Sequence, residues 1–280
     1  MNRVLAAALL FVVGAGSALA AGYDDFSRGV NANNRGDAET AISAFSAALA
    51  SGDLAAAYIP TAHVGRAKAY LQKDNCAEAL SDLDDGIKLK ADDADVFYLR
   101  ADAKVCLNKL DAAQIDFNQA IGLRPRAPYY EWFAQIQWLH GFFPQAAENF
   151  AQAVKQAAEG NKHKPYILLW FAMSAGRAGT FDQAKFAADV SALGSDEWPV
   201  PLLDFYRGKT AVDKVYSEAA SKDAQIAINQ KCEADFYIGE WQLARKNTAD
   251  AKSLLQQAVG ECPHGFIEFS FAQAELKRLP

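Results

Sequence analysis

The sequence predicts an all-α fold in which short amphipathic helices pair into hairpins that stack as a solenoid. The main observation is a recurring trio: an alanine, an apolar residue four positions later, and a small residue three positions after that. Turn-forming residues precede most trios, and alanine is abundant while runs of β-branched residues are rare. The six trios are Ala41/Phe45/Ala48, Ala79/Leu83/Gly86, Ala113/Phe117/Ala120, Ala146/Phe150/Ala153, Ala184/Ala188/Ser191 and Ala251/Leu255/Ala258.

Residues 95–125 show the pattern of one hairpin most clearly. Apolar or small side chains recur there at three- and four-residue spacing, which places them on one face of each of two helices. Small Ala113 and Ala120 would let the two helices approach, and Phe117 would fill the space between them. Pro125 ends the second helix.

The hairpins recur at the period of a known repeat. The first members of the trios are 38, 34, 33, 38 and 67 residues apart, and the last step is close to two periods of about 34 residues. The chain therefore resembles the tetratricopeptide (TPR) repeat family, whose first-helix positions for Trp, Leu-Gly and Tyr are partly filled here. The residues at those positions are Gly29, Ala67, Tyr70, Ala101, Ala134, Ala172 and Gly239.

The repeats divide the chain into predicted segments. Residues 21–197 hold repeats one to five, residues 198–231 form a divergent and shortened repeat, and residues 232–280 hold the last repeat. A helix over 267–277 is expected to cap the open end of the stack, as terminal repeats of solenoids require.

The divergent segment is recognised by its prolines. Pro199, which follows Trp198, and Pro201 break helix. Only short helices are therefore expected there, one of them over 211–220, followed by a loop that reaches about Asn229.

Residues 1–20 have the features of a secretory signal peptide. Arg3 forms a basic start, an apolar run covers 4–13, and a small-residue cleavage motif ends at Ala20. The mature chain is expected to begin at Ala21 in an exported, periplasmic compartment.

The rival interpretation of this segment is a membrane anchor. The apolar run is short for a bilayer span and lacks a basic stop-transfer flank. No cysteine lies near the cleavage site to carry a lipid, and no later stretch is long and apolar enough to cross a membrane. The signal peptide is therefore favoured, and the mature chain is expected to have no transmembrane segment.

The charge balance argues against a nucleic-acid partner. The chain carries 28 Lys and Arg against 34 Asp and Glu, a net charge of −6, without a long basic run. Acidic residues gather between 82 and 95, where a metal site is conceivable. A solvated loop and helix start is the favoured interpretation, since the EF-hand spacing is absent, and no metal or cofactor is predicted.

Four cysteines form two pairs with the same spacing. Cys76 and Cys106 are 30 residues apart, as are Cys232 and Cys262. In antiparallel helix pairs the start of one helix lies beside the end of its neighbour, so both pairs can meet. An exported compartment permits disulfides. A metal site, for which only Cys262 and His264 are close, and reactive thiols are the alternatives.

No sequence motif for catalysis was found. G-x-S-x-G, S-x-x-K, H-E-x-x-H, the P-loop and G-x-G-x-x-G are all missing from the sequence. A non-catalytic protein is predicted, with a concave groove that binds protein segments. Candidate groove residues are Arg66, Lys68, Tyr98, Arg100 and Trp138. The alternatives are core packing for the two aromatic residues and solvated surface for the three cations.

Residues 166–280 resemble a more specific family, the NlpI-type lipoproteins of Gram-negative envelopes. The matching passages are Leu168-Leu169-Trp170, Trp198-Pro199 with Leu203-Asp204-Phe205-Tyr206-Arg207-Gly208, Cys232-Glu233-Ala234-Asp235-Phe236-Tyr237-Ile238-Gly239, and the stretch from Ala258-Val259 through Phe266-Ile267-Glu268 to Glu275-Leu276. This chain differs from the family in lacking the lipid-bearing cysteine and in having four other cysteines.

The resemblance implies an all-helical, homodimeric adaptor that brings a periplasmic processing protease and peptidoglycan hydrolases together. The expected partners are thus other envelope proteins or their peptides. One alternative is a structural subunit or assembly factor of a secretion or polysaccharide export complex. An enzyme with a helical-repeat domain is a third hypothesis, and it is disfavoured because the repeats occupy nearly the whole chain.

Overall fold

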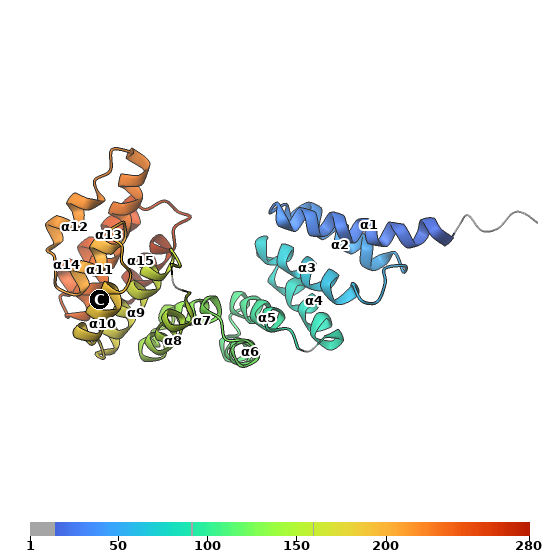
Figure 1. The fold of residues 1–280 in the computed structure, drawn as a ribbon, viewed down its shortest axis with the longest axis horizontal. Coiled ribbons are helices and arrows are strands. Elements are labelled where there is room, and N and C mark those ends of the chain that lie inside the picture. The colour runs from blue at the N-terminus through green and yellow to red at the C-terminus, as the bar shows by residue number, and fades with distance from the viewer. Residues whose placement is uncertain (1–14, 91, 159) are drawn as a thin grey trace, which may run out of the picture. The chain divides into compact units, whose positions relative to one another are not determined.

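The computed structural model describes residues 15–90, 92–158 and 160–280, with side chains from residue 21 onward, and in these ranges it contains fifteen helices and no strand. The predicted all-α fold of helical hairpins is therefore confirmed. The chain divides into two compact units, the first ending at Arg124 and the second beginning at Pro125 (Figure 1). The segments predicted from the sequence have no boundary at this position.

Much of the predicted signal peptide, residues 1–14, lies outside the described residues. The first helix, α1, already begins at Ala15 and runs to Asn34, so it spans the predicted cleavage site between Ala20 and Ala21. None of the helices described combines the length and the apolar character that a membrane span requires.

The first unit consists of three helix pairs. Three residues connect the two helices of each pair. The second helix of a pair packs on the first helix of the next pair within this unit. The helices are α1, α2 (Ala38–Ala50), α3 (Ile59–Gln72), α4 (Cys76–Leu89), α5 (Ala94–Cys106) and α6 (Leu110–Leu123).

The turns between the two helices of a pair share one backbone conformation. The middle residue of each three-residue turn is in the left-handed region, with φ of 72° at Gly36, 56° at Asp74 and Asn108, and 78° at Gly141. This conformation ends an α-helix by satisfying its last carbonyl groups. The turn residues noted in the sequence therefore act as helix stops.

The recurring trio forms the packing between the helices of a pair. All members of five trios are buried, with exposed fractions of 0 or 1% among the alanines and phenylalanines. The ring of Phe45 shows why small residues are required. A Cβ added at Gly65 or Gly29 would lie 2.4 Å and 2.9 Å from this ring.

The trio assigned to the fifth repeat is wrong. Ala184, Ala188 and Ser191 are exposed, whereas Phe186 and Val190 of the same helix are buried. The buried face is shifted by two residues, from Ala184 and Ala188 to Phe186 and Val190. Burying these two larger apolar side chains removes more surface from water than burying two alanines.

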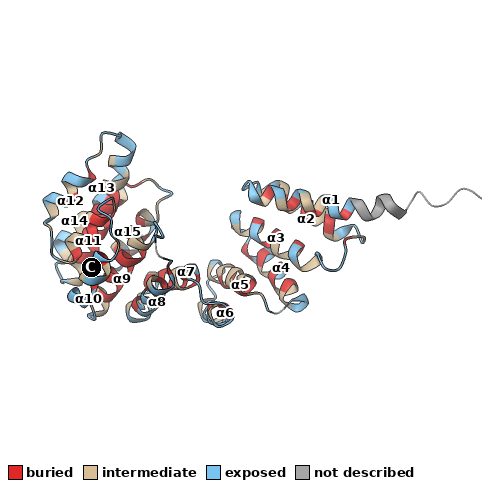
Figure 2. Ribbon diagram, in the orientation of Figure 1, coloured by how far each residue is buried: buried red, intermediate tan, exposed pale blue. Residues whose placement is uncertain are grey.

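The second unit has a larger core with a cluster of four aromatic rings, in which Trp138 and Trp170 contact each other and both Phe236 and Phe271. Figure 2 shows this buried interior in red. The helices are α7 (Ala127–Leu139), α8 (Phe143–Gln156), α9 (Lys164–Ala178), α10 (Gln183–Ser191), α11 (Val200–Tyr206), α12 (Val212–Ala219), α13 (Ala224–Ala244), α14 (Thr248–Glu261) and α15 (Ile267–Arg278).

The divergent segment differs from the expectation at its end. The predicted loop to about Asn229 is wrong, because α13 begins at Ala224, where the Asp223 carboxylate accepts hydrogen bonds from the backbone N–H groups of Gln225 and Ile226. Ile226 is 45% exposed, so this first turn of the helix lacks the buried apolar face by which sequence patterns reveal helices. The N-cap hydrogen bonds from Asp223 stabilise this first turn, which does not pack on the core.

Both cysteine pairs lie at disulfide distance and are joined in the structure. The Cα atoms are 6.1 Å apart for Cys76 and Cys106 and 4.9 Å apart for Cys232 and Cys262. The first pair links the start of α4 to the end of α5, and the second links α13 to the residue after α14. Oxidation of these pairs in the exported protein remains a prediction.

We expect the variant Cys232→Ala/Cys262→Ala to unfold more easily than the oxidised wild type. A crosslink that closes a loop of this length stabilises the folded state by about 3.5 kcal/mol through the entropy of the unfolded chain. Urea unfolding followed by tryptophan fluorescence measures this effect in the second unit, because all five tryptophans lie beyond residue 125. Equal stability of the variant and the oxidised wild type, or titration of free thiols in the native chain, would contradict the prediction.

Candidate functional site

The arginines proposed for the groove are held in place by buried aspartates. Arg66 of α3 donates from Nε and Nη2 to the two carboxylate oxygens of Asp82 in α4, each at 2.7 Å, and from Nη1 to the Ser46 hydroxyl at 2.9 Å. The Nδ1 atom of His63 also lies 2.8 Å from Asp82. These bonds raise the pKa of Arg66.

The same arrangement recurs 34 residues later. Arg100 of α5 makes the two-pronged contact with Asp116 of α6 at 2.7 and 2.8 Å and donates to Asp84 of α4 at 2.8 Å. Asp116 is only 1% exposed and also binds Lys104. Both arginines thus brace neighbouring helices rather than lie free in solvent. Their role in a groove remains a prediction.

The other candidate groove residues do not form a common surface. Trp138 as a groove residue is wrong: it is 0% exposed because aromatic rings enclose it, and the core alternative holds. Tyr98 is half-buried with its ring 6.1 Å from that of Phe117. Lys68 is exposed, but it lies two residues from Arg66 and thus about 200° around α3.

The acidic residues between 82 and 95 have structural partners in the first unit. Asp82 and Asp84 bind the arginines above, the Asp93 carboxylate caps α5, and Asp95 pairs with Arg124. Over the residues described, no group of three or more His, Cys, Asp or Glu side chains has an arrangement that would hold a metal ion.

A pocket in the second unit has a better claim to a binding role. We call it the acidic pocket; its volume is about 290 Å³. Its walls come from the first helices of three helix pairs (α7, α9 and α13), from the residue before α9, and from the final helix α15. The lining residues are Glu131, Gln135, His163, Tyr166, Trp170, Tyr237, Ile267 and Glu268.

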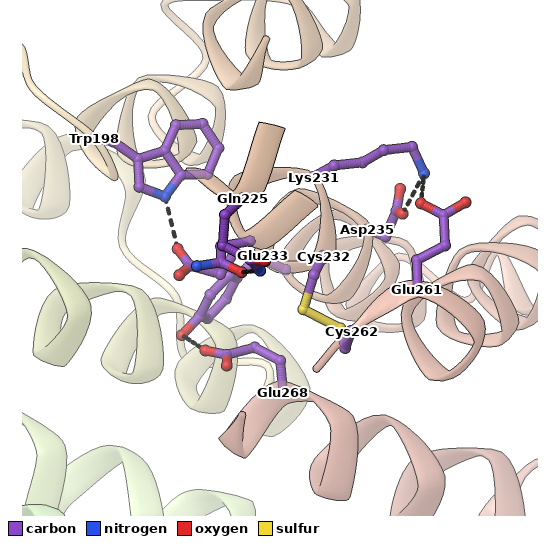
Figure 3. Close-up of a disulfide and its surroundings, with 11 residues drawn as sticks. Trp198, Gln225, Lys231, Cys232, Glu233, Asp235, Glu261, Cys262 and Glu268 are labelled. Carbon is purple, nitrogen blue, oxygen red and sulfur yellow. Dashed lines mark hydrogen bonds and ion pairs between the residues drawn. A yellow bond between two sulfur atoms is a disulfide. The ribbon is translucent and has the colours of Figure 1, made fainter. Parts of the chain in front are cut away.

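Hydrogen bonds hold the carboxylates in and behind this pocket. Glu233 accepts from the Tyr166 hydroxyl at 3.0 Å and from the Trp198 indole N–H at 2.6 Å, as Figure 3 shows for Trp198. Glu268 accepts from the Tyr237 hydroxyl at 3.2 Å. Figure 3 also shows the disulfide beside Glu233, which ties this part of α13 to the end of α14.

Burial shifts the ionisation of these groups. It raises the pKa of Glu233 to about 7, with the charge of Glu268 adding to the effect, and it raises the pKa of Glu268. At the mouth of the pocket His163 lies 2.7 Å from Glu131, and this hydrogen bond raises the pKa of the imidazole.

We expect Glu233 to make the second unit less stable as the pH rises from about 4.5 to about 7. Its pKa is higher in the folded state than in the unfolded chain, so the folded state binds more protons in this window and loses that advantage as the pH rises. The full difference is on the order of 3 kcal/mol. Urea unfolding of Glu233→Gln, which keeps a carbonyl acceptor for Tyr166, should show a flatter pH profile than the wild type. The control is Glu261→Gln, which removes an exposed acid and should keep the pH dependence of the wild type. If the unfolding free energy of Glu233→Gln depended on pH as steeply as that of this control, the prediction would be contradicted.

A second pocket lies on the other side of α9. We call it the basic pocket; it has a volume of about 430 Å³ and is lined by Lys155, Lys164 and Lys185 around the apolar Leu168 and Phe171. Asp189 is its single acidic lining residue, and the remaining lining residues are Ala151, Gln152 and Val154.

Helix geometry explains the separation of the two pockets. Residues 164, 168 and 171 of α9 lie within about 60° of one another, whereas 166 and 170 point to the opposite side. The same helix thus presents a cationic, partly apolar surface on one face and lines an anionic, aromatic pocket with the other.

The chain is similar to known proteins in sequence over part of its length and in fold over most of it. No protein-family model matches the chain. It is 23% identical over 127 residues to the lipoprotein NlpI homolog of Haemophilus influenzae, a match that covers 44% of this chain and 40% of that protein. The chain therefore spans less than half of the length of this relative.

Two solved structures share the fold across most of their length. A tetratricopeptide repeat protein from Parabacteroides merdae covers 92% of this chain and 98% of its own, with a TM-score of 0.57 and 14% identity. The C-terminal part of a TPR repeat-containing protein from Cytophaga hutchinsonii covers 88% and 98%, with a TM-score of 0.53 and 12% identity. The chain thus has the fold of tetratricopeptide-repeat proteins, and over 44% of its length it is similar in sequence to the lipoprotein NlpI homolog.

Proposed function

We propose that the mature chain is an exported, non-catalytic scaffold that binds segments of other envelope proteins. The helical-hairpin fold supports this, since stacked repeats present extended surfaces for partner segments. The signal-like residues 1–20 support export. The partial resemblance to an envelope lipoprotein supports the compartment.

The observation that carries the proposal is the pair of pockets on opposite faces of α9. Their opposite charge suits two different partner segments, one cationic and one anionic. A scaffold that holds two clients raises the effective concentration of each for the other without any chemistry of its own. As the NlpI resemblance implies, the two clients would be a processing protease and a peptidoglycan hydrolase, and the scaffold would be a homodimer.

Site-specific crosslinking tests the proposal. A photoreactive amino acid is placed at Ile267 in the acidic pocket, at Phe171 in the basic pocket, and at exposed Leu89 in the first unit as a control. Crosslinked products from the envelope of the source cells are then identified by mass spectrometry.

We expect each pocket position to capture its own partner above the Leu89 background. Protease and hydrolase partners would support the adaptor, whereas subunits of a secretion or polysaccharide export complex would support the alternative instead. No capture above background at either position, or turnover of peptidoglycan or peptides by the purified chain alone, would overturn the proposed function.

A further inference from the structure

Two carboxylates, Glu268 in the acidic pocket and Glu233 behind it, lack a cation within the described part of the chain. Glu268 and Glu233 are 5% and 8% exposed, and neither forms an ion pair with any residue that the structure describes. Their side-chain partners are the hydroxyl groups of two tyrosines and the indole N–H of Trp198. Buried carboxylates are usually paired with a positive charge, because removing them from water is costly.

Gln135 of α7 supplies a further acceptor in the pocket. It lines the pocket and is 7% exposed. Its amide oxygen and the Glu268 carboxylate offer acceptors to a donor that enters from outside.

The remaining walls are aromatic and can pack against the aliphatic part of a lysine or arginine side chain. Tyr166, Trp170 and Tyr237 contribute aromatic rings, and aromatic rings attract a nearby cation. The volume of about 290 Å³ is at the lower limit of sites for drug-sized ligands, so it fits a single side chain.

From these features we propose that the acidic pocket binds the lysine or arginine side chain of a partner segment, an inference that rests on the proposed scaffold function. The ammonium or guanidinium group donates to Glu268 and to the Gln135 amide oxygen. Its charge compensates the buried carboxylates, and its stem packs against Tyr166 and Trp170.

Binding should depend on pH because the acidic side chains are charged only when deprotonated. Burial keeps part of Glu233 protonated near neutrality, and His163 loses its positive charge as the pH rises. Both changes make the pocket more anionic at higher pH. The titratable groups that face it or lie directly behind it are Glu131 of α7, His163 and Tyr166 at α9, Glu233 and Tyr237 of α13, and Glu268 of α15.

The test uses the mature chain, residues 21–280, and three blocked amino acids: N-acetyl-arginine amide, N-acetyl-lysine amide and the uncharged isostere N-acetyl-citrulline amide. Their binding is followed by NMR through the indole N–H signals of Trp170 and Trp198. We expect saturable shifts with one or both cationic probes, at least tenfold weaker binding of citrulline, and at least threefold tighter cation binding at pH 8 than at pH 5.5.

Two variants make the result specific. Glu268→Gln keeps an acceptor for Tyr237 but removes the charge, and it should weaken cation binding at least tenfold while the protein stays folded. Glu261→Gln removes an exposed acid that pairs with Lys231 outside the pocket and should leave the affinity unchanged. Equal binding of arginine and citrulline probes, or no effect of Glu268→Gln, would overturn the inference.

Failure of this inference is distinguishable from failure of the scaffold function. If the Ile267 crosslinker captures a partner equally well in the wild type and in Glu268→Gln, the scaffold stands and the cation pocket does not. If a cationic probe binds but no position captures a partner, the pocket stands as a cation site and the scaffold function is lost.

Discussion

Replacing Arg177 with methionine is expected to destabilise the second unit by about 3–5 kcal/mol. Arg177 Nη1 donates to one carboxylate oxygen of Glu240 and one of Glu275, each at 2.8 Å, and both acids are 0% exposed. The ring centre of Phe143 lies 4.2 Å from the guanidinium carbon, and methionine can still pack on this ring. The loss of stability in Arg177→Met therefore reports mainly the missing positive charge. Arg278 remains to pair with Glu275, which leaves Glu240 without a cation.

The pH dependence identifies the cause. Burial and the charge of Glu275 raise the pKa of Glu240, so a proton can replace the missing cation as the pH falls. The destabilisation by Arg177→Met should therefore shrink toward acidic pH, and Arg177→Met/Glu240→Gln should recover most of the loss at neutral pH. Urea unfolding with tryptophan fluorescence measures both, with exposed Lys214→Met as the matched control. A loss that grows at low pH, or one no larger than that of the control, is incompatible with the argument.

Trp138→Ala is expected to cost about 3–5 kcal/mol in the second unit. The indole is fully buried, with ring centres 5.1 Å from Phe271, 5.7 Å from Trp170 and 6.4 Å from Phe236. Removing it leaves a cavity among side chains that come from helices far apart in the sequence. Urea unfolding monitored by the remaining tryptophans or by circular dichroism gives the change in free energy.

The same variant separates a core residue from a groove residue. Phe142→Ala, at a position that is 52% exposed, should change the stability by less than about 0.5 kcal/mol. If Trp138→Ala left the stability equally unaffected but abolished partner capture, Trp138 would be a binding residue and the packing described here would be mistaken.

Most of the helical framework could be predicted because it depends on local patterns. The trio at Ala113, Phe117 and Ala120 is readable since it uses the spacing of a single helix, and its burial follows from the partner helix that the turn brings back. The 30-residue cysteine spacing was informative for the same reason. Hairpin geometry relates the end of one helix to the start of its neighbour.

The acidic pocket could not be assembled from the sequence, although one signal was present. Glu233, Asp235 and Glu240 lie in a part of α13 that is buried nearly all round. Acids in such a helix indicate a network or a site, but two of their partners, Tyr166 and Arg177, are 67 and 63 residues away. Helical spacing carries no information about contacts at that distance.

The sequence by itself determined the repeat, the turns, the pairing of helices and the cysteine spacing, because each depends on side chains within about one repeat of one another. Only the tertiary structure decided that Arg66 and Arg100 brace helices, that Trp138 lies in the core, and that α9 separates two pockets of opposite charge. These outcomes depend on which polar groups lose water when helices meet, whether the residues are 16 apart, as Arg66 and Asp82 are, or much farther apart in the chain. That cost is settled by three-dimensional burial and pairing rather than by periodicity.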